Sequence, residues 1–321
     1  MTRRWLVTGG AGFVGSHLAE RLLARGDAVT VLDDLSTGMP ANLPRHPRLD
    51  LRTGDVNDAD ALGAALRGAA GVFHCAATVY VQDCIADWLG AHAVNLGGTI
   101  RVFEAARRAG GLPVVYASSA AVYGDPAGAL CHEDLPERPI SPYGADKLAC
   151  EHQARAFWQV HALPTAGLRF FNVFGPRQSA RSAYAGVLAA FGRDLRLGRA
   201  STIHGDGGQT RDFVHVSDVA RALVAAMGRL GAAPGCLVAN VCTGRSVSVR
   251  DLHALVRRHG GGLGPPPAFA PARPGEIRLS RGCTARMHAV LGRWRTMPLE
   301  EGIAGYLASL GGAGGVLKAA E

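Results

Sequence analysis

A glycine-rich segment at 9–15 lies between an apolar run at 5–8 and a helical pattern at 16–25. Gly26 ends that pattern, and a second apolar run follows at 28–32. Strand, glycine loop, helix and strand in this order are the context in which such a loop binds a dinucleotide. Glycines let the backbone approach a pyrophosphate, and the helix N-terminus offers free N–H groups. The spacing differs from G-x-G-x-x-G by one residue, and a loop that only connects elements is the alternative.

Asp33 closes the second predicted strand. A carboxylate there would accept hydrogen bonds from the adenosine ribose and repel a 2′-phosphate, so NAD is favoured over NADP. A capping role in the turn at 33–38 is compatible with the same geometry.

Further strand-like runs extend this pattern into a sheet. Strand-like runs lie at 49–53, 71–74, 113–117, 165–170 and 237–241, and helical patterns lie between most of them, for example at 99–108 and 143–161. Strands that alternate with helices predict an α/β fold, a Rossmann domain with a doubly wound parallel sheet.

After residue 171 the alternation breaks down, and Gly/Pro-rich turns predict a smaller α+β lobe that binds the substrate. We expect the NAD-binding Rossmann domain at 1–170, with a returning segment at about 212–243. We expect the substrate-binding lobe at 171–211 and 244–310. The Gly/Ala-rich residues 311–321 are expected to form a flexible tail.

Charge and cysteine content limit the partners and the compartment. The net charge is +8, but the arginines are scattered without a basic stripe interleaved with aromatics, which argues against a nucleic-acid partner. No apolar stretch of about 20 residues and no cleavable leader is seen, so we expect no membrane partner. Seven cysteines without a C-x-x-C pair suit a reduced compartment. We expect a cytoplasmic protein without a metal site.

The segment 141–147 sets a tyrosine and a lysine four residues apart at a predicted helix start. Ser141 is a good N-cap and a proline follows it, so Tyr143 and Lys147 would share one face of the first two turns. A phenol with an ordinary pKa of about 10 is a poor base at neutral pH, and a nearby ammonium favours its ionised form. Only one other lysine, Lys318, occurs in the chain, which argues against a chance pair. We interpret Tyr143 as a base and Lys147 as the group that tunes it.

The order of short motifs along the chain resembles the extended short-chain dehydrogenase/reductase family. Within that family it is similar to the NAD-dependent nucleotide-sugar epimerases of the UDP-glucose 4-epimerase type. The motifs are TGGAGFVG (8–15), VLDD (31–34), GDV (54–56), VFHCAA (72–77), NLGGT (95–99), SSAAVYG (118–124), SPYGADK (141–147), RFFNVFGPRQ (169–178), GDGGQTRDFVHV (205–216), NVCTG (240–244) and RPGE (273–276).

This resemblance implies a catalytic set and a cofactor. Ser119 would hold the sugar O4 beside Tyr143, and Lys147 completes the catalytic residues. Phe171 would lie near the nicotinamide, and Asp55 with Val56 at the adenine. The residues implied to bind NAD are Gly9, Gly12, Phe13, Val14, Gly15, Asp33, Asp34, Ser36, Thr37, Gly38, Asp55, Val56, Cys75, Ala76, Ala77, Val79, Asn95, Ser118, Tyr143, Lys147 and Phe171.

The implied substrate is a UDP-sugar. Arginine forks suit phosphate oxygens, which agrees with arginines on the diphosphate. Ser280 corresponds to the family's gatekeeper beside the sugar 2-substituent, where a small residue goes with N-acetylhexosamines. His74 and His215 are interpreted as packing or cofactor-pocket residues, because no second ligand lies at metal spacing. The residues implied to bind the substrate are Ser119, Tyr143, Asn172, Val187, Arg211, Arg273, Glu276 and Ser280.

The residues after the active-site serine, Ala120 and Ala121, bear on the reaction. Family members that dehydrate or decarboxylate usually carry an acidic residue there, and elimination without an acid is disfavoured. The implied activity is therefore 4-epimerisation of UDP-Glc and UDP-Gal through a transient 4-keto intermediate, with UDP-GlcNAc and UDP-GalNAc admitted if Ser280 is the gatekeeper.

Three alternatives stay open. A UDP-glucuronate 4-epimerase fits the same scaffold, and so does a net oxidoreductase that releases NADH. A non-catalytic dinucleotide-binding protein would need only the glycine loop. The family usually forms homodimers through helices that correspond to 91–108 and 143–161, so a homodimer is expected.

Overall fold

The computed structural model describes residues 2–179, 186–262, 265–272 and 277–312. Its centre is a parallel seven-stranded sheet with the order β10-β6-β5-β4-β1-β2-β3, and all seven strands coincide with the predicted strand segments to within two residues at each end. They are β1 (Arg4–Thr8), β2 (Ala28–Asp33), β3 (Leu49–Thr53), β4 (Val72–His74), β5 (Val114–Ser119), β6 (Thr165–Phe170) and β10 (Cys236–Val241). The predicted α/β Rossmann fold is confirmed.

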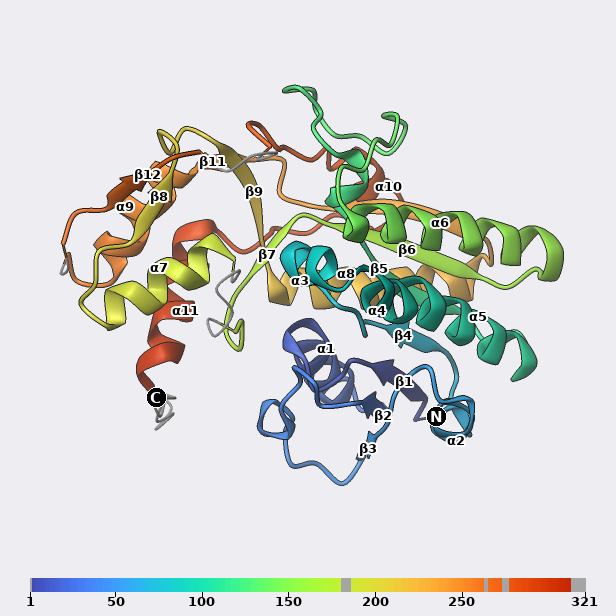
Figure 1. Cartoon of the computed structure of the whole chain (residues 1–321). Helices are drawn as coiled ribbons and strands as arrows, with labels where there is room; N and C mark the ends of the chain where they lie inside the picture. Colours follow the sequence, from blue (N-terminus) through green and yellow to red (C-terminus); the bar gives the residue numbers. More distant parts are fainter. Residues whose placement is uncertain (1, 180–185, 263–264, 273–276, 313–321) are drawn as a thin grey trace.

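Helices cover both faces of this sheet (Figure 1). One face packs against α1 (Phe13–Ala24), α8 (Val216–Ala232) and α10 (Ala285–Leu291), whose apolar side chains join one core cluster. The other face packs against α2 (Ala59–Leu66), α5 (Gly98–Arg108) and α6 (Pro142–His161), which form a second cluster. The sheet is therefore doubly wound, and its carboxyl edge lies between two helical layers.

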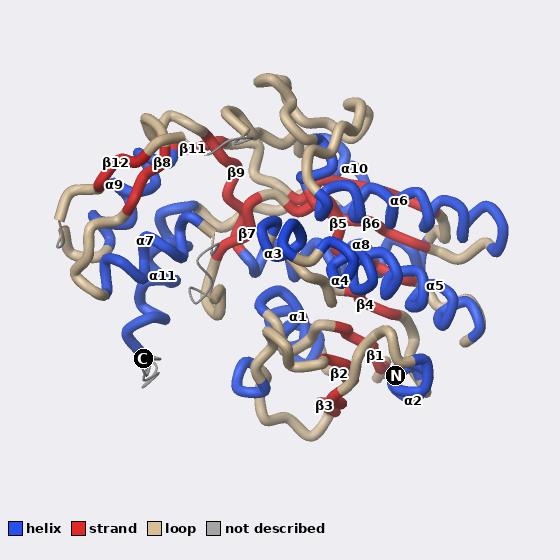
Figure 2. The backbone as a smooth tube through the Cα atoms, viewed as in Figure 1, coloured by secondary structure: helices blue, strands red, loops and turns tan. Residues whose placement is uncertain are grey.

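A smaller part of the structure lies beyond the carboxyl edge of the sheet. Figure 2 shows its short strands and its helices, separate from the main sheet. One small sheet has the order β11-β9-β7 and a second pairs β12 with β8. The elements are β7 (Asn172–Phe174), α7 (Val187–Arg196), β8 (Thr202–His204), β9 (Thr210–His215), β11 (Ser246–Ser248), α9 (Val249–His259), β12 (Ala268–Ala270) and α11 (Leu299–Gly312). Their apolar side chains form a third cluster of their own.

Most of these elements fall within the residues expected for the substrate-binding lobe, but most of β9 lies in the segment at about 212–243 that was expected to return to the Rossmann domain. The division into domains remains a prediction. Most of the expected tail, 313–321, lies outside the described residues, while α11 extends to Gly312. Within the described part of the chain, no helix has both the length and the apolar character needed to cross a membrane.

Some helix boundaries differ from the expected ones. α1 begins at Phe13 and not at residue 16, because Gly12 already serves as its N-cap inside the glycine loop. The predicted helix at 99–108 is the last part of a longer helical stretch. It continues from α4 (Trp88–His92) through a π-helical turn, Ala93–Gly97, into α5. A preceding helix, α3 (Val81–Ala86), and two 3-10 helices, Pro40–Asn42 and Ala120–Tyr123, complete the described elements.

Candidate active site

The start of α6 brings the predicted tyrosine and lysine together. The Ser141 hydroxyl accepts a hydrogen bond from Gly144 N at 3.1 Å, and the next residue is a proline at the first helical position. Lys147 Nζ lies 5.7 Å from the centroid of the Tyr143 ring. It also donates to Ala117 O at 2.9 Å, which holds the ammonium at the end of β5. Lys147 is 3% exposed and Tyr143 is half-buried, so the ammonium is largely shielded from water while the phenol remains reachable.

Ser119, the last residue of β5, caps the 3-10 helix Ala120–Tyr123. Its Oγ accepts a hydrogen bond from Ala121 N at 3.1 Å, which leaves the hydroxyl proton free to be donated. This helix and α6 approach closely at Gly144, where an added Cβ would lie 2.7 Å from Ala121 O. The 3-10 helix that follows Ser119 therefore lies against the first turn of α6, which contains Tyr143.

The glycine loop suits a pyrophosphate. Gly12 N donates to Gly9 O at 3.2 Å, which closes the turn before α1. Gly12 has no side chain to cap α1, so among the described residues no side chain caps the N–H groups of the first turn, at Phe13 and Val14. Gly15 lies against the turn, where an added Cβ would be 2.2 Å from Gly9 O. Free donors at a helix N-terminus bind phosphate groups, so these residues fit the diphosphate of NAD.

Asp33 fastens this loop to the end of β2. Its Oδ2 accepts from Ala11 N and its Oδ1 from Leu35 N, both at 2.9 Å. Burial raises the pKa of this carboxyl, and the backbone N–H groups of Leu35 and Ala11 oppose that shift. The capping role that the sequence left open is thus present. A carboxylate can accept about four hydrogen bonds, so a ribose contact remains compatible with these backbone contacts.

The turn after Asp33 is open to solvent. Asp34 Oδ1 accepts from Ser36 N at 3.0 Å and from Ser36 Oγ at 2.7 Å, so this side chain shapes the turn. Thr37 is exposed beside it, and Gly38 packs against Asp33. Further along the same edge, Asp55 is exposed.

The segment after β4, predicted to run along the cofactor, is held by Asn95. This amide is fully buried, and its Oδ1 accepts from Thr78 N at 2.9 Å while Nδ2 donates to Thr78 O at 3.1 Å. Asn95 therefore positions the strip that contains Ala76, Ala77 and Val79. Burial raises the pKa of the Cys75 thiol to about 12, so that group stays neutral.

His74 is a packing residue. Its Nδ1 lies 2.7 Å from Thr8 Oγ1 and its Nε2 lies 3.0 Å from Thr99 Oγ1. Burial, and to a lesser degree the charge of Lys147, lowers its pKa from 6.5 to about 3. The ring is therefore neutral at ordinary pH and links β1, β4 and α5. His215 caps α8 through Ser217, so both histidines have structural roles here.

This burial predicts a pH effect on stability. The unfolded chain takes up a proton on His74 below about pH 6.5, while the folded chain does not. The free energy of unfolding should therefore be highest above that pH and should fall as the pH is lowered below it. The loss should be about 1–2 kcal/mol between about pH 6.5 and 5. Urea unfolding of His74→Gln should show a shallower fall over this range than the parent chain. The exposed His132→Gln variant is the control and should reproduce the parent slope, and a parent slope in His74→Gln would contradict the interpretation.

The predicted substrate residues come from both parts of the structure. Phe171 directly follows β6 and is 5% exposed, whereas the next residue, Asn172, is exposed. Arg211 in β9 donates to Thr210 O at 2.8 Å and to Ile277 O at 2.7 Å. Ser280 N donates to Thr210 O at 3.3 Å, so the segment with Ser280 runs beside β9. Val187 is the first residue of α7, and Arg273 and Glu276 lie outside the described residues.

Comparison with known proteins decides the family. Residues 5–242 match the model of the NAD dependent epimerase/dehydratase family. The chain belongs to this family. It is 41% identical over 308 residues to a UDP-glucose 4-epimerase of Mycolicibacterium smegmatis, covering 94% of this chain and 96% of the relative.

Solved structures agree. A UDP-glucose 4-epimerase of Thermus thermophilus in complex with NAD has a TM-score of 0.87 and 35% identity, covering 97% of this chain and 99% of that one. A UDP-N-acetylglucosamine 4-epimerase of Methanobrevibacter ruminantium, in complex with UDP-N-acetylmuramic acid, has a TM-score of 0.90 and 31% identity, covering 96% and 98%. The resemblance seen in the sequence is confirmed at the level of the family and its NAD dependence.

A buried ionic group that was not predicted from the sequence joins the end of β5 to α6 and β6. The Ser118 hydroxyl, predicted to contact the cofactor, donates to Glu151 Oε1 at 2.5 Å. Glu151 also accepts from Arg169, and all three side chains are at most 4% exposed. The pattern that would have revealed it is the continued four-residue spacing from Tyr143 through Lys147 to Glu151.

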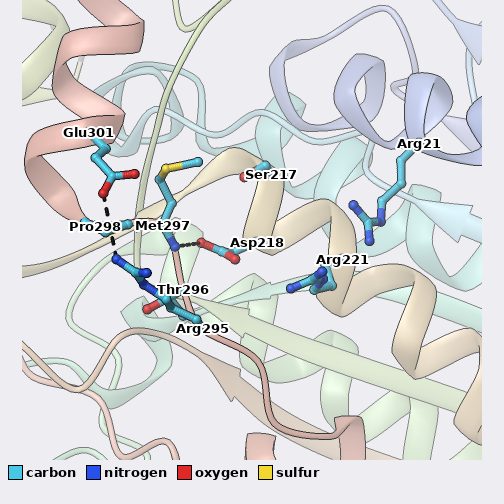
Figure 3. A pocket seen from close by; sticks show the side chains of 9 residues that line it. All are labelled: Arg21, Ser217, Asp218, Arg221, Arg295, Thr296, Met297, Pro298 and Glu301. Carbon is cyan, nitrogen blue, oxygen red and sulfur yellow. Dashed lines mark hydrogen bonds and ion pairs between the residues drawn. The ribbon is translucent and has the colours of Figure 1, made fainter.

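A cavity of about 350 Å³ lies elsewhere, between α1, α8 and the residues before α11 (Figure 3). Arg21 and Arg221 extend toward it, and Asp218 on its wall accepts from Trp294 Nε1 at 3.0 Å and from Met297 N at 2.8 Å. None of the predicted site residues that the structure describes lines this cavity. The chemistry of the family motif therefore belongs to the carboxyl edge of the sheet and not to this recess.

Proposed function

We propose that this chain is a UDP-sugar 4-epimerase, an isomerase that works with tightly held NAD. The observation that carries the proposal is the approach of a buried Lys147 to Tyr143 on one face of α6, whose first turn packs against the 3-10 helix that follows Ser119. The 41% identity to a UDP-glucose 4-epimerase supports UDP-glucose and UDP-galactose as substrates.

Each catalytic residue has one task in this proposal. Tyr143 as phenolate accepts the proton of the sugar 4-hydroxyl and later returns it. Lys147 stabilises the phenolate, and burial strengthens this effect because little water screens the ammonium. Ser119 donates its free hydroxyl proton to the sugar O4. When bound, NAD supplies the acceptor and donor of the C4 hydride, which gives a 4-keto sugar as the transient species.

The alanines after Ser119 favour this reaction over elimination. Ala120 and Ala121 open the 3-10 helix that faces α6, and neither can protonate a leaving hydroxyl. A net oxidoreductase is tested by incubating the protein with substrate and excess NAD. The epimerase should accumulate no NADH as product forms, whereas NADH in proportion to product would point to net oxidation.

Ser280 is proposed as the residue that admits the N-acetyl group. The segment that contains it lies along β9 through the Thr210 contact, beside Arg211. Ser280→Tyr should lower the ratio of the UDP-GlcNAc rate to the UDP-Glc rate by about 10-fold, because a tyrosine would fill space that the 2-substituent needs. The UDP-Glc rate of the same variant is the internal control. An unchanged ratio would remove Ser280 from this role.

A homodimer is proposed from the outer face of the helices beside the site. Figure 1 shows α4, α5 and α6 next to one another. Trp88 and Leu89 on α4 are 60% and 83% exposed, and Val160 on α6 is 72% exposed. Phe157 instead packs against Phe103 at 5.5 Å and belongs to the core. Exposed apolar side chains of this kind suit an interface between two copies.

The seven cysteines are all free thiols, which supports a cytoplasmic location.

A further inference from the structure

Three side chains at four-residue intervals face the end of the sheet from α6. Tyr143 comes first, Lys147 is one turn further and donates to Ala117 O, and Glu151 is one turn beyond that. Glu151 Oε1 accepts from the Ser118 hydroxyl at 2.5 Å. Two side-chain hydrogen bonds, from Lys147 to Ala117 and from Ser118 to Glu151, thus join α6 to the residues that immediately precede Ser119.

Arg169, in β6, also binds Glu151, next to the Ser118 hydroxyl. Its register partner across the sheet is Ser118, so the guanidinium arises beside that hydroxyl. Nε donates to Glu151 Oε1 at 2.9 Å and Nη2 to Glu151 Oε2 at 2.7 Å, while Nη2 also reaches Glu137 Oε1 at 2.7 Å. The guanidinium lies 4.8 Å from the centroid of the Tyr123 ring. Burial opposes its charge, but the hydrogen bonds and charge of Glu151 outweigh burial and raise the pKa of Arg169.

This fork determines what Lys147 can pair with. A lysine and a glutamate four residues apart on a helix ordinarily attract each other. Here both Glu151 oxygens are engaged by Arg169, and one also by Ser118. In the part of the chain that the structure describes, no carboxylate lies within ion-pair distance of Lys147. Its charge is therefore left to act on Tyr143, whose ring is 5.7 Å away.

We propose that Arg169 and Glu151 are positioning residues of the reaction: their fork fixes α6 against Ser118 and Ser119, and Arg169 neutralises Glu151 so that the charge of Lys147 favours the Tyr143 phenolate. The proposal rests on the proposed function of Tyr143 as base. It contains two separate effects: the paired hydrogen bonds of Arg169 to Glu151 hold α6 in place, and the charge of Arg169 offsets the charge of Glu151. Different substitutions change one and spare the other.

Glu151→Gln removes the negative charge and keeps an amide of the same shape. Arg169 then keeps its ion pair with Glu137, so the region near Tyr143 has lost one negative charge. The fall of kcat on the acidic side of its pH profile, here called the low-pH limb, should move to lower pH. The expected shift is about half a unit to one unit, for a unit charge two helical turns away in a partly buried site. Glu151→Gln combined with Arg169→Gln restores the charge balance and should return the limb to its parent position. Arg169→Lys keeps the charge but loses the fork, so kcat should fall while the limb stays in place.

A control variant and a second measurement separate this effect from misfolding and from a failure of the proposed function. Glu104→Gln removes a carboxylate that pairs with Arg107 and Arg108 on α5, and it should leave the limb unchanged. The tyrosinate absorbance that Tyr143→Phe abolishes should follow the same shifts in a pH titration, without any turnover. A limb and a titration that do not move in Glu151→Gln would overturn the proposal, as would a shift that persists in the double variant. Absence of epimerisation in the parent chain would instead refute the proposed function.

Discussion

Tyr143→Phe should lower kcat for C4 epimerisation by about 10³-fold, within the range that general acid–base groups contribute. The substitution removes one oxygen and leaves the ring, so the packing at the start of α6 is preserved. Lys147 keeps its bond to Ala117 O, and the glycine loop is not touched. The variant should therefore retain its NAD while it loses turnover.

The measurement is kcat together with the NAD content of the purified variant. Tyr306→Phe is the matched control, because this tyrosine lies in α11 and its buried hydroxyl has no hydrogen-bond partner in the described structure. It should keep both kcat and NAD. Parent-like turnover in Tyr143→Phe would remove Tyr143 from the role of base, and loss of NAD in that variant would mean that turnover was lost for another reason.

Gly15→Ala should abolish NAD retention and with it the activity. The added Cβ would lie 2.2 Å from Gly9 O and 2.7 Å from Gly10 Cα, and both are backbone atoms of the loop itself. The chain can relieve this contact only by opening the turn, which would turn the first-turn N–H groups of α1 away from the pyrophosphate. The change should show as NAD missing from the denatured protein and as little turnover after purification.

Gly63→Ala is the control for a glycine substitution in a helix. Gly63 lies on the exposed side of α2, and nothing is within 4 Å of its added Cβ. Alanine there should raise helix stability by up to about 1 kcal/mol and leave NAD in place. Normal NAD content in Gly15→Ala would contradict the close approach of the loop and α1 on which the cofactor site is built.

Most strands of the central sheet were predictable because they are buried on both faces and form apolar runs, whereas the edge strand β3 is only half-buried and contains Asp50 and Arg52. Strands β7, β8, β11 and β12 have only three residues each, which is too short for a period to be seen. The early start of α1 also escaped, because the helix begins inside a glycine loop and Gly12 has no side chain that identifies a cap.

The pairing of Tyr143 with Lys147 was predictable from local spacing, whereas the buried contacts around the pair were not. Tyr143 and Lys147 are one turn apart on a single helix, so their spacing alone places them on one face. The partnership of Glu151 with Arg169 depends on the register of β5 with β6, which pairs Ser118 with a residue far along the chain. Likewise, the side chain of Asn95 was expected at the cofactor, and its bonds to Thr78 are visible only once the segment after β4 is in place.

The most direct test of the account is to incubate the purified protein, without added cofactor, with UDP-Glc and to resolve the C4 epimers by chromatography. We expect a mixture of UDP-Glc and UDP-Gal, because the protein would carry its own NAD and regenerate it in each turnover. UDP-GlcNAc and UDP-glucuronate tested in parallel would identify the preferred sugar. No conversion of any of the three, even after NAD is added, would contradict the proposal that Tyr143, Lys147 and Ser119 form the site of a UDP-sugar 4-epimerase.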